Sequence, residues 1–354
     1  MSVYRQARRE RLLGLLGRLG LGAALLHAPA NFAHYTNGAD NRVDRADPSG
    51  VAAVLVTPDG EWVVTDDIEA VRMRDEETPG MEVVEHPWYE TPDGLVRELT
   101  GGARIGSDLP ATGEDDISGG LARLRYVLDP DATERYRSVG PDAAAALAET
   151  AAAVSPDTAE LEAAAELEAA LRRRGMNAAV LLAGGEGRAA RYRHPVSRAG
   201  VGADIAGLGG RAMLVACAER GGLYANATRM VDLREPGPET RRMQAACDNI
   251  LARAREATRP GRTLSEVFAE IAEAYREEGF PEGWRHHHQG GITGYASREV
   301  IATPHTEVEI GAGMAFAFNP SLSGSGAFAK AEETFLLRPD GPERLTEINE
   351  EGGS

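Results

Sequence analysis

The sequence is poor in cysteine and contains no long apolar run. Its two cysteines, Cys217 and Cys247, stand 30 positions apart without a CxxC pair. This spacing argues against a zinc knuckle, a thioredoxin-type motif and a disulfide scaffold. No segment approaches the ~18 consecutive apolar residues that a membrane-spanning helix needs. We therefore expect two buried thiols and no membrane partner.

Basic charge is also scarce. The chain has 38 basic and 55 acidic residues, a formal net charge of −17, and Lys330 is its only lysine. The basic residues form no block that could follow a phosphate backbone. We therefore expect no nucleic-acid partner, and a small molecule or short peptide as the substrate.

The N-terminal segment superficially resembles a secretion signal, because basic residues precede a group of leucines. However, Arg18 interrupts the apolar run, and the spacing of the leucines suits an amphipathic helix. We expect a structural helix over residues 4–20 and a cytoplasmic protein.

With 354 residues and 42% hydrophobic content, the chain is long enough for two domains. Helix and strand patterns alternate in the first third, which predicts an α/β domain. The loop-like stretch 101–120 is the expected linker, and we place the domains at 1–125 and 126–354. The elements expected in the first domain are a helix at 4–20, strands at 23–27, 51–56 and 61–64, and a helix-strand pair within 94–108.

The second domain is expected to be α+β, with helices covering a curved antiparallel sheet. Gly221-Gly222 predicts a hairpin, and Thr263 or Ser265 is the expected cap of the last helix. The predicted elements are helices at 132–154, 158–174, 238–257 and 264–278, a buried strand at 180–183, hairpin strands at 213–218 and 223–230, and further strands from 314 onward.

Polar residues gather in the strip 285–334, which contains three consecutive histidines, glycine turns, Asn-Pro and a Lys-x-Glu pair. On an extended strand alternate residues share a face, so His286 could share one with His288, and Lys330 with Glu332. A loop would relax that limit for the histidines. Three interpretations stay open for them: a metal site, a pocket of neutral imidazoles, or structural packing.

Seven ordered segments resemble the peptidase M24 family, which has the pita-bread fold and includes methionine and proline aminopeptidases, prolidase and creatinase. The resemblance implies a creatinase/prolidase-type N-terminal α/β domain followed by an α+β pita-bread domain. It also implies a homodimer in which one subunit's N-terminal domain overhangs the partner's pocket. The segments are NFAHYTNG at 31–38, ERYR at 134–137, RYRHP at 191–195, LYANATR at 223–229, HHHQGGITGY at 286–295, GMAFAFNP at 313–320 and KAEET at 330–334.

In the metallopeptidases of this family, two aspartates, a histidine and two glutamates hold two divalent metals that generate the attacking hydroxide. The resemblance maps these ligands onto Val215 or Ala216, Asn226, Gly291, Asn319 and Glu332. Only Glu332 retains a ligand side chain, and one carboxylate cannot hold a metal pair. We therefore expect no cofactor; the alternative is a single divalent metal held by the histidines and Glu332.

The remaining polar residues predict a substrate pocket. Histidine titrates near neutrality and can move protons, whereas arginine can bind a carboxylate through two hydrogen bonds. Glu332 could bind a cationic substrate group, with Lys330 keeping it ionised or replacing a metal's charge. An Arg298–Glu299 salt bridge is the structural alternative. The predicted catalytic residues are His194, His287 and Glu332, and the predicted substrate-binding residues are His288, Arg298, Glu299, Asn226, Asn319 and Lys330.

Three functions are compatible with this pattern. The first is a metal-independent, creatinase-like hydrolase that cleaves a C–N bond in a small polar or amino-acid-derived substrate by histidine acid–base chemistry. The second is an Xaa-Pro aminopeptidase-type metallopeptidase with atypical ligands. The third is a non-catalytic protein that binds a substrate-like molecule.

Overall fold

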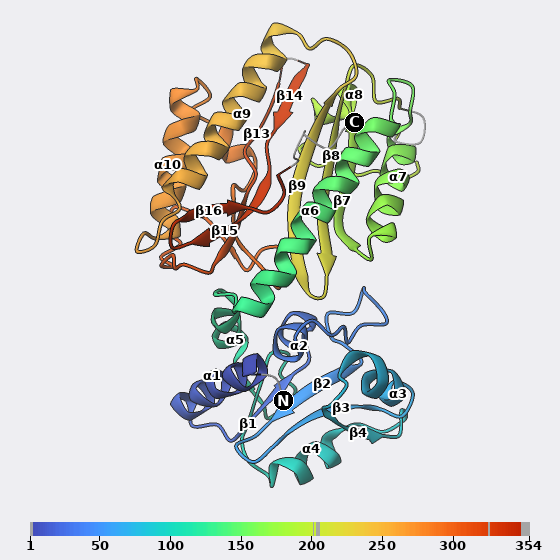
Figure 1. Ribbon diagram of the computed structural model, residues 1–354, viewed down its shortest axis with the longest axis vertical. Coiled ribbons are helices and arrows are strands. Elements are labelled where there is room, and N and C mark those ends of the chain that lie inside the picture. The colour runs from blue at the N-terminus through green and yellow to red at the C-terminus, as the bar shows by residue number, and fades with distance from the viewer. Residues whose placement is uncertain (1–2, 201, 203–205, 325, 348–354) are drawn as a thin grey trace. The chain divides into compact units, whose positions relative to one another are not determined.

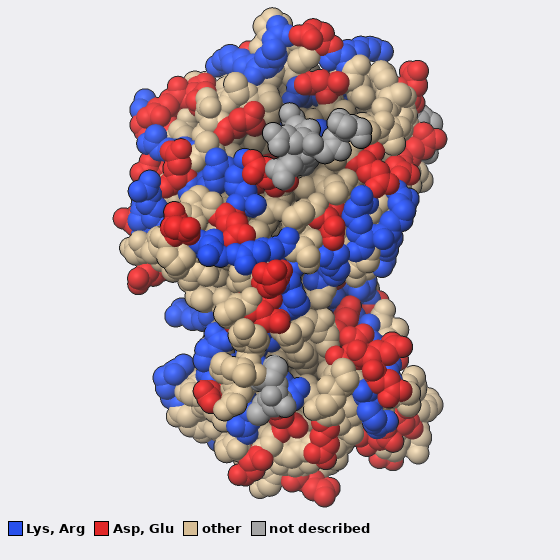
Figure 2. All heavy atoms as spheres, in the orientation of Figure 1, with Lys and Arg blue, Asp and Glu red and all other residues tan. Residues whose placement is uncertain are grey.

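The computed structural model describes residues 3–200, 202, 206–324 and 326–347. The chain divides into two compact units, Met1–Asp131 and Ala132–Ser354. The boundary that we predicted at residue 125 lies a few residues before this division. Acidic and basic side chains are interspersed over the visible face of each unit (Figure 2).

The N-terminal unit is built around one mixed sheet of six strands in the order β4-β3-β2-β1-β5-β6. Strand β2 runs antiparallel to β1 and β3, whereas the pairs β1–β5, β3–β4 and β5–β6 are parallel. The strands are β1 (Ala23–Leu26), β2 (Ala52–Val56), β3 (Glu61–Asp66), β4 (Glu82–His86), β5 (Ile105–Ser107) and β6 (Asp115–Asp116).

Helices cover both faces of this sheet, so its central strands are apolar throughout. In β1, Ala24 and Leu26 face a core that includes leucines of α1, while Ala23 and Leu25 face a second core that includes Val96 of α4. The helices are α1 (Val3–Leu19), α2 (Pro29–Thr36), α3 (Ala70–Arg72), α4 (Asp93–Thr100) and α5 (Ser118–Arg125). The predicted N-terminal helix is thus present, and its leucines at 12, 15 and 16 are buried.

The stretch 101–120 is not a linker, because β5 and β6 within it are paired into the sheet. At Gly106 a Cβ atom would lie 2.8 Å from Ile117, so close packing requires glycine there. The high content of glycine and aspartate therefore reflects tight turns and close contacts within the domain. The sequence analysis also missed α2 and the edge strand β4.

The C-terminal unit combines antiparallel sheets with long helices (Figure 1). Strands β7, β8 and β9 form one sheet, and the order β11-β10-β12-β15-β16 forms another, accompanied by the hairpin β13–β14. A bridge between Thr228 and Glu332 connects the first sheet to the segment before β15. The strands are β7 (Asn177–Gly185), β8 (Arg211–Arg220), β9 (Leu223–Asp232), β10 (Gly290–Thr293), β11 (Val300–Ile301), β12 (Ala315–Phe318), β13 (Ser321–Gly324), β14 (Ala327–Lys330), β15 (Glu333–Arg338) and β16 (Gly341–Arg344).

The four helices predicted in this unit are present, whereas the short helix α8 was not predicted. Thr263 caps α10, because its hydroxyl accepts a hydrogen bond from the Glu266 N–H while the Glu266 carboxylate accepts one from the Thr263 N–H. The helices are α6 (Pro130–Ala153), α7 (Glu160–Arg173), α8 (Glu186–Ala189), α9 (Pro238–Ala257) and α10 (Leu264–Glu277). Within the described residues, no helix is both long and apolar enough to cross a membrane.

Candidate functional site

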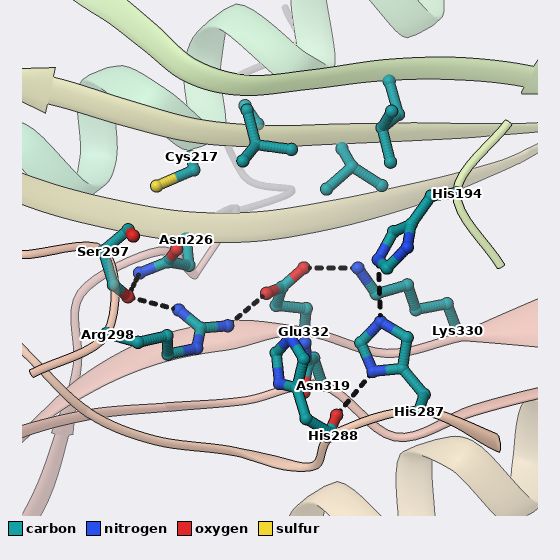
Figure 3. A pocket seen from close by; sticks show the side chains of 14 residues that line it. His194, Cys217, Asn226, His287, His288, Ser297, Arg298, Asn319, Lys330 and Glu332 are labelled. Atoms are coloured by element: carbon teal, nitrogen blue, oxygen red, sulfur yellow. Dashed lines mark hydrogen bonds and ion pairs between the residues drawn. The ribbon is translucent and has the colours of Figure 1, made fainter. Parts of the chain in front are cut away.

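The C-terminal unit contains a pocket of about 130 Å³ between the β7–β9 sheet and the segments that carry the polar strip (Figure 3). Side chains from distant parts of the chain converge on it. It is lined by Val180, Leu182, His194, Val215, Ala216, Cys217, Asn226, His287, His288, Ser297, Arg298, Asn319, Lys330 and Glu332. All of the predicted site residues except Glu299 are in this set.

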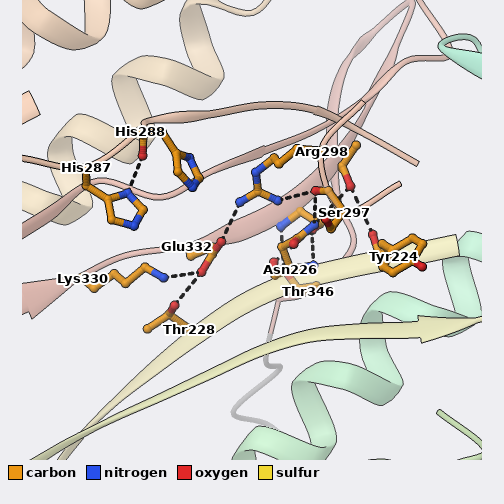
Figure 4. Close-up of polar contacts among 12 residues, drawn as sticks. Tyr224, Asn226, Thr228, His287, His288, Ser297, Arg298, Lys330, Glu332 and Thr346 are labelled. Carbon is orange, nitrogen blue, oxygen red and sulfur yellow. Dashed lines mark hydrogen bonds and ion pairs between the residues drawn. The ribbon is translucent and has the colours of Figure 1, made fainter. Parts of the chain in front are cut away.

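Glu332 is the centre of the polar network (Figure 4). Its Oε2 accepts hydrogen bonds from Lys330 Nζ at 2.7 Å and from Thr228 Oγ1 at 2.8 Å, and its Oε1 accepts one from Arg298 at 2.9 Å. Both carboxylate oxygens are therefore engaged by the protein, which leaves little capacity for the predicted contact with a cationic substrate group.

Burial and charge act in opposite directions on Glu332. Its side chain is only 4% exposed, and this burial alone would raise the pKa of the carboxyl group. The charges of Lys330 and Arg298 and the hydrogen bonds from Lys330 and Thr228 outweigh burial, lowering the pKa of Glu332 to about 2. Glu332 is thus ionised at neutral pH.

Strand geometry explains why these groups meet. Asn226 and Thr228 are two positions apart on β9 and so project from the same face. The same alternation brings Lys330 beside Glu332, as predicted from the sequence. Arg298 forms an ion pair with Glu332, which lies 34 positions away.

The three histidines do not lie on a regular strand. A 3₁₀ turn covers Gly283–His286, and His287 follows in an extended conformation. As a result His287 and His288 both line the pocket, whereas His286 is not among its lining residues. The limit that a regular strand would impose on the histidines does not apply, because the segment is a turn, as the loop alternative allowed.

His194 and His287 form a hydrogen-bonded pair, with 3.0 Å between their Nε2 atoms. Nδ1 of His287 is also hydrogen-bonded, to the carbonyl oxygen of His288. A carbonyl oxygen can only accept, so this Nδ1 carries the proton. In the neutral ring Nε2 of His287 must then accept, and Nε2 of His194 must donate. We assign these tautomers from the hydrogen-bond network.

The pocket favours neutral imidazoles. Burial, followed by the charge of Lys330, lowers the pKa of His287 to about 3 and also lowers the pKa of His194. Partial burial and the charge of Arg298 lower the pKa of His288 to about 4. Burial raises the pKa of the Cys217 thiol to about 12, so Cys217 is not a thiolate nucleophile at neutral pH.

These residues do not fit the metal pair that the resemblance implies. The described residues contain no group of three or more histidine, cysteine, aspartate or glutamate side chains arranged to hold a metal ion. At Gly291, onto which the resemblance maps the family's ligand histidine, a Cβ atom would lie 2.1 Å from the Val300 carbonyl oxygen, so no side chain fits without backbone movement. Among the described lining residues Glu332 supplies the only carboxylate, and this carboxylate lies 2.7 Å from the ammonium group of Lys330.

Some site residues were missed from the sequence. Thr228 is one, although its spacing from Asn226 on a predicted strand was a usable signal. Cys217 and Ser297 also line the pocket and carry no motif of their own. Val180 was expected to be buried but is 43% exposed, since it faces the pocket.

Solved structures of low sequence identity share this fold. The Xaa-Pro dipeptidase from Bacillus anthracis has a TM-score of 0.80 and 18% identity, covering 98% of this chain and 99% of that one. The prolidase from Pyrococcus horikoshii OT3 has a TM-score of 0.80 and 17% identity, with coverage of 98% and 99%. The N-terminal domain of the FACT complex subunit SPT16 from Cicer arietinum has a TM-score of 0.71 and 11% identity, with coverage of 98% and 96%.

No curated protein sequence matches this chain significantly. Two families do match: residues 8–114 match the Creatinase/Prolidase N-terminal domain, and residues 134–339, more than half of the chain, match Metallopeptidase family M24. The protein therefore belongs to metallopeptidase family M24, a family of hydrolases that cleave C–N bonds, and carries a creatinase/prolidase N-terminal domain.

Proposed function

We propose that this protein is a metal-independent hydrolase that cleaves a C–N bond in a small polar or amino-acid-derived substrate. The observation that carries the proposal is the His194–His287 pair, which lies in one pocket with the Arg298–Glu332–Lys330 network. The pocket thus combines a proton-transfer pair with fixed positive charge, and its residues do not suit divalent metals.

The tautomers select His194 as the general base. Nδ1 of His194 accepts no hydrogen bond from any described residue, whereas both ring nitrogens of His287 are engaged. In the proposed reaction, Nδ1 of His194 takes a proton from water while the water oxygen attacks the electrophilic carbon. His287 is a positioning residue, because its Nε2 accepts from His194 and stabilises the imidazolium that forms.

The same proton completes the reaction. When the C–N bond breaks, the imidazolium of His194 returns its proton to the leaving nitrogen, so atoms and charge balance. The ammonium of Lys330 and the guanidinium of Arg298 would stabilise the negative charge that develops on the attacked group. Glu332 holds both cations in place and keeps them paired in the absence of substrate.

The proposal is tested with a panel of amidine, guanidine, cyclic-amidine and Xaa-Pro compounds, each assayed after EDTA treatment and again with added manganese. We expect turnover that EDTA leaves unchanged. A His194→Gln variant should lose roughly 10²-fold or more in kcat, the range of general acid–base catalysis. Exposed His305 supplies the matched control, His305→Gln, which should retain full activity. Turnover that EDTA abolishes and manganese restores would refute metal independence.

Two other functions have support. The fold shared with a dipeptidase and a prolidase favours an Xaa-Pro metallopeptidase, which requires bound metal in near-stoichiometric amount. Elemental analysis of the purified protein that finds no such metal would remove this function. The fold shared with a FACT complex subunit favours a non-catalytic binding protein. That function predicts ligand binding without turnover, and His287→Ala would then change affinity only.

A further inference from the structure

We infer that the pocket selects a compact anionic ligand and rejects one whose only charge is an ammonium group. The inference concerns the proposed active site but does not require turnover, so it can hold for a catalyst or for a binding protein. Three properties of the described residues support it: a surplus of hydrogen-bond donors, a net positive charge and a small volume.

Donors exceed acceptors in the pocket. Lys330 has three N–H groups, of which one is used on Glu332. Arg298 uses one nitrogen on Glu332 and another on the Ser297 carbonyl, while its Nε is buried without a partner. The carboxylate of Glu332 already accepts three hydrogen bonds, so the remaining donors need acceptor atoms that a ligand must supply.

One buried acceptor also lacks a partner. Asn319 is 3% exposed, lines the pocket, and has no hydrogen bond to its Oδ1 within the described part of the chain. A buried amide oxygen without a partner is costly, so a ligand N–H group that reaches this oxygen would stabilise the site. The expected ligand therefore offers mainly acceptor oxygens and at least one N–H donor.

Charge favours the same ligand. Lys330 and Arg298 give two positive charges, and Glu332 gives one negative charge, which leaves a net charge of +1 on the ionised lining residues. At 3.0 Å the two facing Nε2 atoms of His194 and His287 cannot both carry protons, so at least one of these rings is neutral. The pocket is thus positive, although the whole chain has a formal charge of −17.

The volume sets the size of the part of the ligand that the pocket can enclose. A cavity of about 130 Å³ corresponds to roughly four waters at ~30 Å³ each, or to a molecule of roughly six to eight non-hydrogen atoms. N-acetylglycine has this size, one carboxylate and one amide N–H, and its uncharged and cationic counterparts are N-acetylglycinamide and glycinamide. The first two compounds differ mainly in charge, whereas glycinamide also lacks the acetyl group; all three serve as probes.

The test is isothermal titration of the full-length protein with each probe at about 0.15 M salt, where exposed charges beyond ~8 Å are screened. We expect N-acetylglycine to bind at least roughly tenfold more tightly than N-acetylglycinamide, as charge-assisted hydrogen bonds imply, and glycinamide not to bind. Equal affinities, a preference for the amide or the cation, or no measurable binding of the anion would overturn the inference.

Two variants locate the preference within the pocket. Asn319→Asp adds a second carboxylate, and Lys330→Met removes a cation; each should abolish the tenfold preference for the anion. Arg253→Gln is the matched control, because Arg253 is a partly exposed cation on α9 whose loss should leave the preference unchanged. A preference that survives in a folded Asn319→Asp protein would place the anion elsewhere and refute the assignment.

Catalysis is measured separately, by following acetate release from N-acetylglycine with proton NMR. Selective anion binding without hydrolysis of this probe would support the inference and leave the hydrolase proposal to the substrate panel. Hydrolysis of cationic probes by a metal-free protein would support the hydrolase and refute the ligand class.

Discussion

Replacing Glu332 by glutamine is expected to destabilise the C-terminal unit by about 4 kcal/mol, the middle of the range for removing one partner of a buried ion pair. The substitution leaves Lys330 and Arg298 inside the protein without an opposite charge. At the observed 2.7 Å from Lys330, and with an effective dielectric constant of ~20, the gross Coulomb attraction is about 6 kcal/mol. Desolvation of the buried groups offsets much of this attraction.

Lys330→Met should lower the free energy of unfolding by less, about 2 kcal/mol, since Glu332 retains hydrogen bonds from Arg298 and Thr228. The double variant should be less destabilised than the sum of the two single variants. We expect a coupling energy of about 2 kcal/mol, within the range measured for residues in direct contact.

The assay is urea unfolding followed by the fluorescence of Trp284, which lies in the C-terminal unit with its ring 5.3 Å from that of Phe268. Replacing Trp62 and Trp88 by phenylalanine restricts the signal to this unit, because the two units need not unfold together. Effects that add to within about 0.5 kcal/mol would show that the pair is energetically independent and refute the reasoning.

A surface pair provides the control. Arg253 and Glu270 lie 2.9 Å apart but are 43% and 31% exposed. The same cycle with Arg253→Gln and Glu270→Gln should give a coupling of at most about 1 kcal/mol. A larger coupling on the surface than in the pocket would mean that burial is not the source of the effect.

Three further outcomes are expected. The pKa of Glu332 is lowered to about 2 from its usual 4.5. The stabilisation that Glu332 contributes is therefore present above pH 4.5 and is lost as the pH falls toward 2. The urea midpoint measured against pH should show this decrease. The lowered pKa values of His287 and His288 also decrease stability as the pH falls, because the unfolded rings take up protons below their usual pKa of 6.5 while the folded rings resist protonation. A urea midpoint that does not change between pH 6.5 and 3 would contradict both statements. Gly291→Ala should lower the free energy of unfolding by about 3 kcal/mol or more, because its Cβ would lie 2.1 Å from the Val300 carbonyl oxygen. An unchanged melting temperature would show that β11 can shift at little cost in free energy. From the resemblance we also propose a homodimer, so sedimentation should give twice the 37.6 kDa chain mass, and a monomeric mass would refute it.

Local patterns were sufficient to predict most elements of the C-terminal unit. The helix expected at 238–257 is present with those bounds, and the hairpin turns at the Gly221-Gly222 pair as expected. These features depend on periodicity and turn chemistry within a short segment. The helix α2 was missed, although Pro29 at its start and Asn37 in a left-handed conformation after its end are local signals.

The site was predictable as a set of residues but not as a network. The sequence indicated that Lys330 and Glu332 share a face, because strand alternation is a local property. It could not indicate that Arg298 pairs with Glu332, because that contact depends on how distant segments pack. The same holds for His194 and His287, which are 93 positions apart and form a hydrogen bond only in the folded protein.

The close packing at Gly291 also limits whether amino-acid substitutions could turn this pocket into a metal-binding site. A histidine introduced at Gly291 would have no space unless β11, which carries the Val300 carbonyl, moved away from β10. Restoring carboxylates alone would place new negative charges beside Lys330 and Arg298 without supplying an imidazole. Converting this pocket into the family's metal site therefore requires backbone rearrangement. Point substitutions at the positions onto which the resemblance maps the ligands would not be enough, in natural or in laboratory evolution.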